Sequence, residues 1–345
     1  MDALAALRLR TRRLTEHRTA SGGDYVLCWL QQALRAEENP VIDVALAVGN
    51  ARGLPVVVVH TLETAYPYAS DRLHRFILEA SASLGPSVEA RGLRFARYVR
   101  GASGDETTVE VIGRLAERAA TVVLDDVPTF VTRTYADALA AAIPREVLAV
   151  DACCSVPMNA IQRPLATTKA FRAAHTQLRR AHLALDLCQR PEHDAYNGDL
   201  DLAHTDLDAR GLDALVAGLD IDHSVPPVAR WNGSREAAME RLRFAVEHVV
   251  PRYKWTRNNP ALENASTEIS PWMHFGVLSP REVAGAVLEA EASGAVHRDA
   301  RWKFLDELLT WREYYHHRCR SVPGFSRWEG LPAGARKTLT AHASD

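Results

Sequence analysis

The pattern of hydrophobic and polar residues changes character partway along this chain of 345 residues. Up to about residue 155, short runs rich in Val, Leu and Ile alternate with longer amphipathic segments such as 39–51 and 108–120. Strands spaced by helix-length segments indicate βαβ crossovers, and therefore a parallel, doubly wound sheet whose ligands bind at the carboxyl ends of the strands. We predict strands at 23–30, 55–60, 93–99, 121–126 and 146–151.

The second part of the chain has the spacing of helices. From roughly residue 165 onward the β-rich runs disappear, and apolar residues recur with a helical period. Residues 186–222 carry ten Asp or Glu against Arg190 and Arg210, which we interpret as a solvated connection. Repulsion from DNA and a partner surface are the alternatives. We predict an α/β domain at 1–160, a connector at 161–230 and an all-α domain at 231–345.

Composition narrows the class of protein. The chain is 47% hydrophobic and 24% charged with a net charge of -2, which is the balance of a globular protein without a general attraction to nucleic acid. No apolar run approaches the roughly 20 residues of a membrane span, and the N-terminus lacks the pattern of a signal peptide, so we expect a cytoplasmic protein without membrane contact. Five cysteines in irregular positions predict neither disulfides nor a metal site.

Residues 258–276, NNPALENASTEISPWMHFG, combine hydroxyl side chains with a helix start. Ser270 precedes a proline, as does Ser279, and each serine is predicted to be the N-cap of a helix; Glu282 completes a capping box in the second. Hydroxyl groups beside a helix N-terminus favour phosphate binding. The alternative is that these are two well-capped helices of a bundle.

A helix predicted at 301–320 carries a carboxylate on an aromatic line. Glu307 shares this line with Phe304 and Trp311. Burial among aromatic rings favours the protonated acid, which can donate as well as accept a hydrogen bond, so Glu307 is a candidate site residue. In the alternative, Glu307 pairs with Arg312 or Arg318, and Trp311 only packs.

Cations alternate with aromatic residues in RYKWTRNNP, residues 252–260, as in segments that bind nucleic acid. Taken in order, these features resemble the DNA photolyase/cryptochrome family, and most of all the class II cyclobutane pyrimidine dimer photolyases. The resemblance rests on residues 23–40, 53–80, 257–280, 304–315 and 331–345.

The resemblance implies a Rossmann-like antenna domain followed by a helical domain that binds FAD. It assigns the FAD phosphates and ribityl chain to Tyr253, Ser266, Thr267, Glu268, Ile269 and Ser270. Phe304 is then near the flavin, and Arg257 contacts the DNA backbone. Glu307, Trp311 and Arg312 face the flipped dimer. The implied enzyme is a deoxyribodipyrimidine photo-lyase, which repairs UV-damaged DNA by electron transfer from reduced FAD in light.

The same resemblance leaves alternatives and departures. A cryptochrome-like photoreceptor without repair activity is one alternative; an inactive truncated photolyase is another, because family members continue with a further helical segment beyond 331–345. Glu268 stands where the family has a neutral or basic residue, and Trp311 where class II members usually have arginine. We expect a monomer, and an antenna chromophore of folate or deazaflavin type that the sequence does not select.

Overall fold

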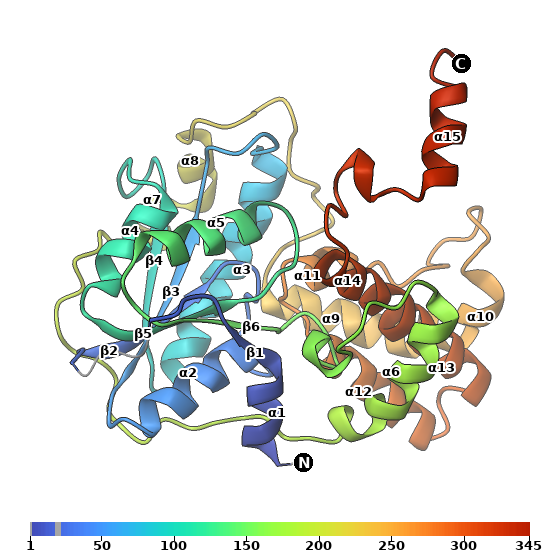
Figure 1. Ribbon diagram of the computed structural model, residues 1–345, viewed down its shortest axis with the longest axis horizontal. Coiled ribbons are helices and arrows are strands. Elements are labelled where there is room, and N and C mark those ends of the chain that lie inside the picture. The colour runs from blue at the N-terminus through green and yellow to red at the C-terminus, as the bar shows by residue number, and fades with distance from the viewer. Residues whose placement is uncertain (1, 18–21) are drawn as a thin grey trace.

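The computed structural model describes residues 2–17 and 22–345, and its first half is built on a six-stranded sheet (Figure 1). The strands are β1 (Thr11–Arg13), β2 (Tyr25–Leu30), β3 (Val56–Leu62), β4 (Arg94–Val99), β5 (Ala119–Asp125) and β6 (Val147–Val150). Their order across the sheet is β1-β6-β5-β2-β3-β4. Among the parallel strands, the chain starts with β2 near the centre, adds β3 and β4 on one side, and then adds β5 and β6 on the other, which confirms the doubly wound α/β fold.

All the ladders among β2 to β6 are parallel, as predicted, whereas β1 pairs with β6 in antiparallel fashion. Strand β1 was not predicted, because its sequence TRR is too short and too polar to show a pattern. The central strands are buried on both faces, and Val56 to Val59 are at most 3% exposed. Such double burial explains why these strands are continuous apolar runs.

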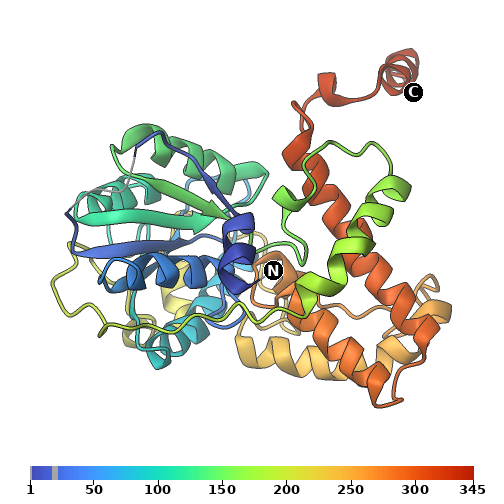
Figure 2. The same cartoon turned by 60° about the horizontal axis from the view of Figure 1, so that its bottom comes forward.

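Helices cover both faces of the sheet (Figure 2). The helices of this half are α1 (Ala3–Arg10), α2 (Pro40–Asn50), α3 (Asp71–Ala90), α4 (Thr108–Ala116) and α5 (Phe130–Ala142). Helices α2 and α3 pack on one face and share its core cluster, whereas α4 and α5 pack on the other. The carboxyl edge of the sheet is left facing the second half of the molecule.

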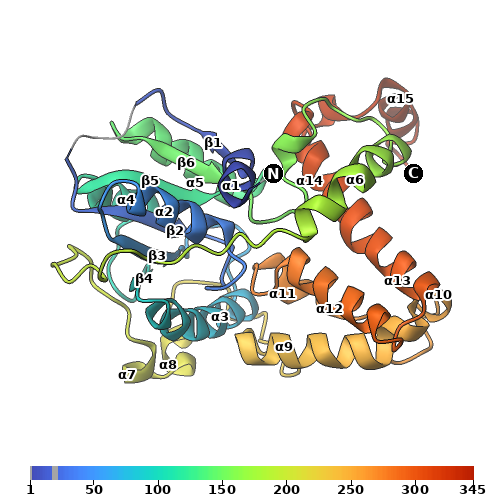
Figure 3. The ribbon, with the colours of Figure 1, turned by 90° about the horizontal axis from the view of Figure 1, so that it is seen from below.

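The second half is helical and lies beside the α/β half (Figure 3). Its elements are α6 (Thr168–Leu183), α9 (Arg235–Phe244), the π-helical segment η2 (Ala245–Val249), η3 (Val250–Arg252), α10 (Tyr253–Thr256), α11 (Ser270–His274), α12 (Pro280–Ala292), α13 (Arg298–Leu305), the π-helical segment η4 (Asp306–Trp311), α14 (Arg312–Ser321), η5 (Trp328–Gly330) and α15 (Ala333–Ala341). An α/β sheet followed by a helical domain is the predicted fold class.

The predicted connector is more structured than a solvated linker. It contains α6, which packs against η4, and short helices α7 (Leu207–Arg210) and α8 (Leu212–Ala217), the second of which packs against α3. The backbone N–H of Thr205 donates to the carbonyl of Arg97 at 2.9 Å. The connector therefore runs along the α/β half, although our division of the chain at 160 and 230 stays a prediction.

One hydrophobic core continues from the sheet into the helical half. Trp272 is 2% exposed, its indole N–H donates to the carbonyl of Asn232, and its ring packs 6.0 Å from that of Phe76 in α3. Phe275 lies 5.5 Å from the same ring. The aromatic side chains of Trp272 and Phe275 therefore pack α11 against the α/β half.

A buried polar network also joins the two halves. The guanidinium of Arg10, which is 0% exposed, donates to the carbonyls of Asp151, Cys154 and Ser155. From α14, the Glu313 carboxylate accepts the backbone N–H of Ser155 at 2.7 Å and contacts His175 Nε2 at 2.8 Å. Residues 151–155, which follow β6, are therefore bound by Arg10 from the α/β half and by Glu313 from the helical half.

Among the described helices, none is long and apolar enough to cross a membrane.

Candidate functional site

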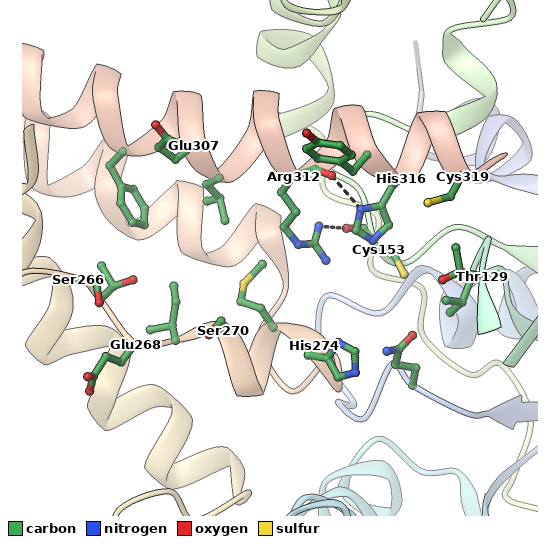
Figure 4. Close-up of a pocket in the computed structure, with 18 of the residues that line it drawn as sticks. Thr129, Cys153, Ser266, Glu268, Ser270, His274, Glu307, Arg312, His316 and Cys319 are labelled. Carbon is green, nitrogen blue, oxygen red and sulfur yellow. Dashed lines mark hydrogen bonds between the residues drawn. The ribbon is translucent and has the colours of Figure 1, made fainter. Parts of the chain in front are cut away.

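A cavity of about 900 Å³ lies between the carboxyl edge of the sheet and the helical half (Figure 4). The α/β half contributes Gln32, the loop 127–129 after β5, and Cys153 after β6. The helical half contributes residues 266–270, which we term the hydroxyl loop, and one face of α13, η4 and α14. This interdomain cavity lies beside the switch point between β2 and β5, where doubly wound folds bind their ligands.

Nine of the eleven residues predicted for the flavin and DNA site line the interdomain cavity. They are Tyr253, Ser266, Thr267, Glu268, Ile269, Ser270, Phe304, Glu307 and Arg312. The other two, Arg257 and Trp311, are not part of its lining. Arg257 nevertheless contacts the site, because its guanidinium lies 3.0 Å from the Glu307 carboxylate.

The π-helical segment η4 explains why Arg312 lines the cavity and Trp311 does not. In a regular α-helix each residue turns by about 100°, so a residue four positions after Glu307 shares its face and a residue five positions later does not. A π-helical turn holds one more residue, which shifts everything after it by one position. Arg312 therefore takes the place expected for Trp311, whose side chain is 37% exposed outside the cavity.

The environment predicted for Glu307 is wrong. Its carboxylate is about a quarter exposed and lies 2.6 Å from Lys303 Nζ as well as 3.0 Å from Arg257. Neither arginine considered in the alternative, Arg312 or Arg318, is its partner, and Arg312 instead donates to the carbonyl of Cys153 at 2.6 Å. Glu307 is thus an ion-paired carboxylate at the cavity wall, and Arg312 ties α14 to the α/β half.

Glu268 lies between two arginines. Its carboxylate is 3.6 Å from Arg230 and 3.5 Å from Arg241, and Arg241 also donates to the carbonyl of Thr267 at 2.8 Å. The backbone of Glu268 has φ +54°, a left-handed conformation that is uncommon for residues other than glycine. The hydroxyl loop therefore turns sharply here, and the carboxylate is matched by guanidinium groups in the same wall.

The two predicted helix starts have different outcomes. At Ser279 the capping box is confirmed, since its hydroxyl accepts the N–H of Arg281 and Glu282 reaches back to the backbone of Ser279. Helix α11 begins with Ser270 itself, and its N-cap is Ile269, which makes no side-chain hydrogen bond. The prediction that Ser270 is an N-cap is therefore wrong by one residue, and its hydroxyl is left exposed at the cavity.

Sequence reasoning missed a group of residues at the inner end of the cavity. Burial, together with the nearby Arg312, lowers the pKa of His274 and lowers that of His316 to about 4. Burial raises the pKa of Cys153 to about 12. All three side chains are therefore uncharged at neutral pH. They come from three separate segments without a shared motif, so only the fold brings them together.

A second cavity of about 320 Å³ lies at the carboxyl ends of β2 and β3, next to the start of α5. Its lining is rich in aromatic side chains, namely Trp29, Tyr66, Tyr68, Phe130, Tyr135 and Phe275. It shares Gln32, Val127, Thr129 and His274 with the interdomain cavity. We term it the sheet-edge cavity. No sequence pattern predicted it, because its aromatic residues lie on four separate segments.

No group of three or more His, Cys, Asp or Glu that could hold a metal ion occurs in residues 2–17 and 22–345.

Known proteins resemble this chain in sequence and in architecture. Residues 26–192 match the DNA photolyase family. The chain is 24% identical over 339 residues to the deoxyribodipyrimidine photo-lyase of Methanothermobacter thermautotrophicus, covering 97% of this chain and 70% of that protein. It is 26% identical over 336 residues to the deoxyribodipyrimidine photo-lyase of Oryza sativa subsp. japonica, covering 94% and 63%.

The fold agrees with a solved structure as well. The cryptochrome of Synechocystis sp. PCC6803 superimposes with a TM-score of 0.66 at 18% identity, over 88% of this chain and 62% of that one. The chain thus spans about two thirds of the length of the proteins it matches. In its sequence relatives and its two-part architecture, the chain is similar to members of the DNA photolyase/cryptochrome family.

Proposed function

We propose that the protein is a light-driven DNA lyase that repairs cyclobutane pyrimidine dimers with FAD bound in the interdomain cavity. The observation that carries the proposal is that nine of the eleven predicted site residues line this one cavity. The class II assignment remains part of the proposal, as do a monomeric state and a cytoplasmic location.

The lining of the interdomain cavity fits a flavin nucleotide. Its volume of about 900 Å³ is within the range of small-molecule sites. Hydroxyl groups of Ser266 and Ser270 lie on one side, where a ribityl chain or phosphate could accept and donate hydrogen bonds, and Phe304 offers an apolar ring. Tyr253 packs edge-on against Phe304 at 5.2 Å, which fixes both rings.

The negative charge of the FAD phosphates needs cationic partners beside the hydroxyl loop. Arg230 and Arg241 stand beside the hydroxyl loop, and a guanidinium can bind phosphate oxygens in bidentate fashion. Glu268 opposes this attraction, so we propose that it swings out or shares its arginines when FAD binds. The cavity therefore has the donors for FAD, with one carboxylate that weakens the binding.

When bound and reduced, FAD would supply the electron that splits the dimer after excitation by light. The residues of this chain would bind and orient. We propose that Glu307 and Arg312 contact the base edges of a dimer extruded from the duplex, where preorganised charges stabilise a radical anion. Arg257, paired with Glu307, would link this contact to the DNA backbone, and Trp311 would lie on the outer side of the helix toward DNA.

The sheet-edge cavity is the proposed site of an antenna chromophore. Its aromatic lining suits a planar heterocycle of folate or deazaflavin type, and its shared wall with the interdomain cavity would bring the two chromophores close. Close approach favours transfer of excitation energy to the flavin.

An absorption spectrum and a light-dependent repair assay test the function. The protein purified with added FAD is expected to show flavin bands and to restore a dimer-containing oligonucleotide in light and not in the dark. Bound flavin without repair would favour the alternative, a cryptochrome-like photoreceptor, which the structural similarity to a cryptochrome also suggests. Absence of flavin binding would contradict both.

A further inference from the structure

His60 is a buried histidine that has no task in the proposed repair reaction. It lies on β3, is 0% exposed and lines the sheet-edge cavity. Its Nδ1 lies 2.8 Å from the hydroxyl of Ser81 in α3, whereas its Nε2 has no hydrogen-bond partner among the described residues. A buried ring nitrogen without a partner destabilises the fold, which points to a group that is still to be bound.

The contacts of Ser81 determine which ring nitrogen of His60 carries the proton. Arg97 Nε donates to Ser81 Oγ at 2.6 Å, and Arg97 Nη2 donates to the Ser81 carbonyl at 2.5 Å. The hydroxyl oxygen already accepts from Arg97, and its own proton has no acceptor in the described chain other than His60 Nδ1. Nδ1 therefore accepts, and the neutral ring must carry its proton on Nε2.

The charge state of the ring supports this assignment. Burial, together with the nearby Arg97 guanidinium, lowers the pKa of His60 to about 3, so the ring is neutral at pH 7. Arg97 is itself held in place, since its Nη1 donates to the carbonyl of Thr205 at 3.2 Å. The arrangement from Arg97 through Ser81 to His60 is thus a fixed relay of donors that ends at the sheet-edge cavity.

A second buried group in the same lining also lacks a partner. Thr108 is 2% exposed, and its Oγ1 makes no hydrogen bond among the described residues. The amide of Gln31 in this lining also has no partner among the described residues, and most of the other lining residues are aromatic or apolar. A ligand that satisfies these groups needs a flat body to stack between the rings and a hydrogen-bonding edge to reach His60.

We propose that His60 Nε2–H is the hydrogen-bond donor that selects the ligand of the sheet-edge cavity, with Ser81 and Arg97 as the residues that position it. The ligand class is a planar heteroaromatic with a carbonyl oxygen or an unprotonated ring nitrogen on its edge, as in an isoalloxazine or a pterin. The inference rests on the proposed second-chromophore site, and it does not depend on dimer repair.

The protonated nitrogen can be observed in the wild-type protein. In protein labelled with ¹⁵N-histidine, long-range ¹H–¹⁵N correlation at pH 7 is expected to show His60 with Nε2 protonated and Nδ1 bare. The His60 signal is assigned by its loss in His60→Gln. Ser81→Ala should shift the ring toward a mixture of the two forms. A ring protonated on Nδ1 in the wild type would overturn the proposal.

Ligand selection is tested with riboflavin on FAD-saturated protein, followed by quenching of riboflavin fluorescence. His60→Leu is expected to weaken riboflavin binding at least tenfold, and His60→Gln, which keeps a donor, less than threefold. His193→Leu removes an exposed histidine and should change nothing. Anthracene, which is flat but has no acceptor, should bind His60→Leu as well as it binds the wild type.

The outcomes separate this proposal from the repair proposal. If riboflavin and anthracene lose affinity equally in His60→Leu, His60 only packs and the proposal is wrong. If wild-type protein does not bind riboflavin or folate, it is also wrong, whatever the repair assay shows. If riboflavin binding depends on His60 while light-dependent repair is absent, the ligand inference stands and the repair proposal fails.

Discussion

Single carboxylates set the charge of the interdomain cavity. Glu268 lies between Arg230 and Arg241, and Glu307 lies between Lys303 and Arg257. Each carboxylate thus compensates two cations that would otherwise attract phosphate or DNA. Because the pairs are partly exposed, each is worth only about 1 kcal/mol or less, so a bound anion can compete for them.

Removal of the Glu268 charge should strengthen FAD binding. In Glu268→Gln the two arginines lose their internal partner and are free to bind phosphate, so the affinity for FAD should rise about fivefold, or roughly 1 kcal/mol. Isothermal titration with FAD measures the change. Glu289→Gln makes the same change of charge on the exposed side of α12 and should leave the affinity unchanged. A weaker affinity in Glu268→Gln would show that the carboxylate itself helps to bind FAD.

Glu307 is expected to affect repair much more than flavin binding. Glu307→Gln keeps the size of the side chain but removes the charge that orders Lys303 and Arg257 at the proposed dimer site. We expect the light-dependent rate to fall about 100-fold, as for the loss of one preorganised catalytic contact, while the FAD affinity changes less than twofold. Asp299→Asn, which removes the partner of the surface residue Lys254, is the matched control. Equal losses of repair and FAD binding would assign Glu307 to the flavin.

Secondary-structure elements could be predicted where burial imposes a pattern. The five parallel strands were predicted within two residues because their side chains are almost all buried, which leaves short runs rich in apolar residues. Strand β1 has three residues and depends on pairing with distant β6, so no local pattern marks it. The helix at 301–320 was predicted, but not its π-helical segment, because apolar spacing does not reveal one extra residue in a turn.

The two serines that precede prolines should differ in their effect on stability. Ser279 caps α12 through its hydroxyl, so Ser279→Ala should lower the free energy of unfolding by about 1 kcal/mol. Ser270 accepts no capping hydrogen bond, so Ser270→Ala should change it by less than about 0.5 kcal/mol. Urea denaturation at pH 7 measures both variants. Equal losses would mean that α11 is capped by Ser270 in solution.

At the scale of the whole molecule, the candidate site was predictable only in part. The residues of the hydroxyl loop and of the helix at 301–320 were found because each group is contiguous or periodic in sequence. The Arg257 and Glu307 pair spans 50 positions, and Cys153 reaches the cavity from the loop after β6. Contacts between distant segments depend on how the two halves pack, which no local pattern contains.

The buried network between the halves should make stability depend on acid pH. Burial raises the pKa of Glu313, but His175 and the Ser155 N–H bring it below its ordinary value of 4.5. A carboxylate with a depressed pKa stabilises the fold above pH 4.5, and this contribution is lost as the pH falls through the depressed value. Glu313→Gln should therefore cost about 3 kcal/mol at pH 7, because it breaks a buried pair.

The difference between Glu313→Gln and the wild type should shrink as the pH falls below 4.5, which urea denaturation at pH 7, 5 and 4 can follow. Asp299→Asn breaks a surface pair with Lys254 and should cost less than about 1 kcal/mol at each pH. A pH-independent cost of Glu313→Gln would show that the residue acts through packing alone.

The wide turn at Asp306–Trp311 amounts to a one-residue insertion in an otherwise straight rod. Deleting Thr310 would close the turn into a regular helix and bring Arg312 to the fourth position after Glu307, so the guanidinium would stay on the same wall. Closing the turn without a deletion would instead bring the indole of Trp311 to that wall, although no residue had been lost. In a lineage of such proteins, loss of a single codon here is therefore compatible with an unchanged polarity of the binding site.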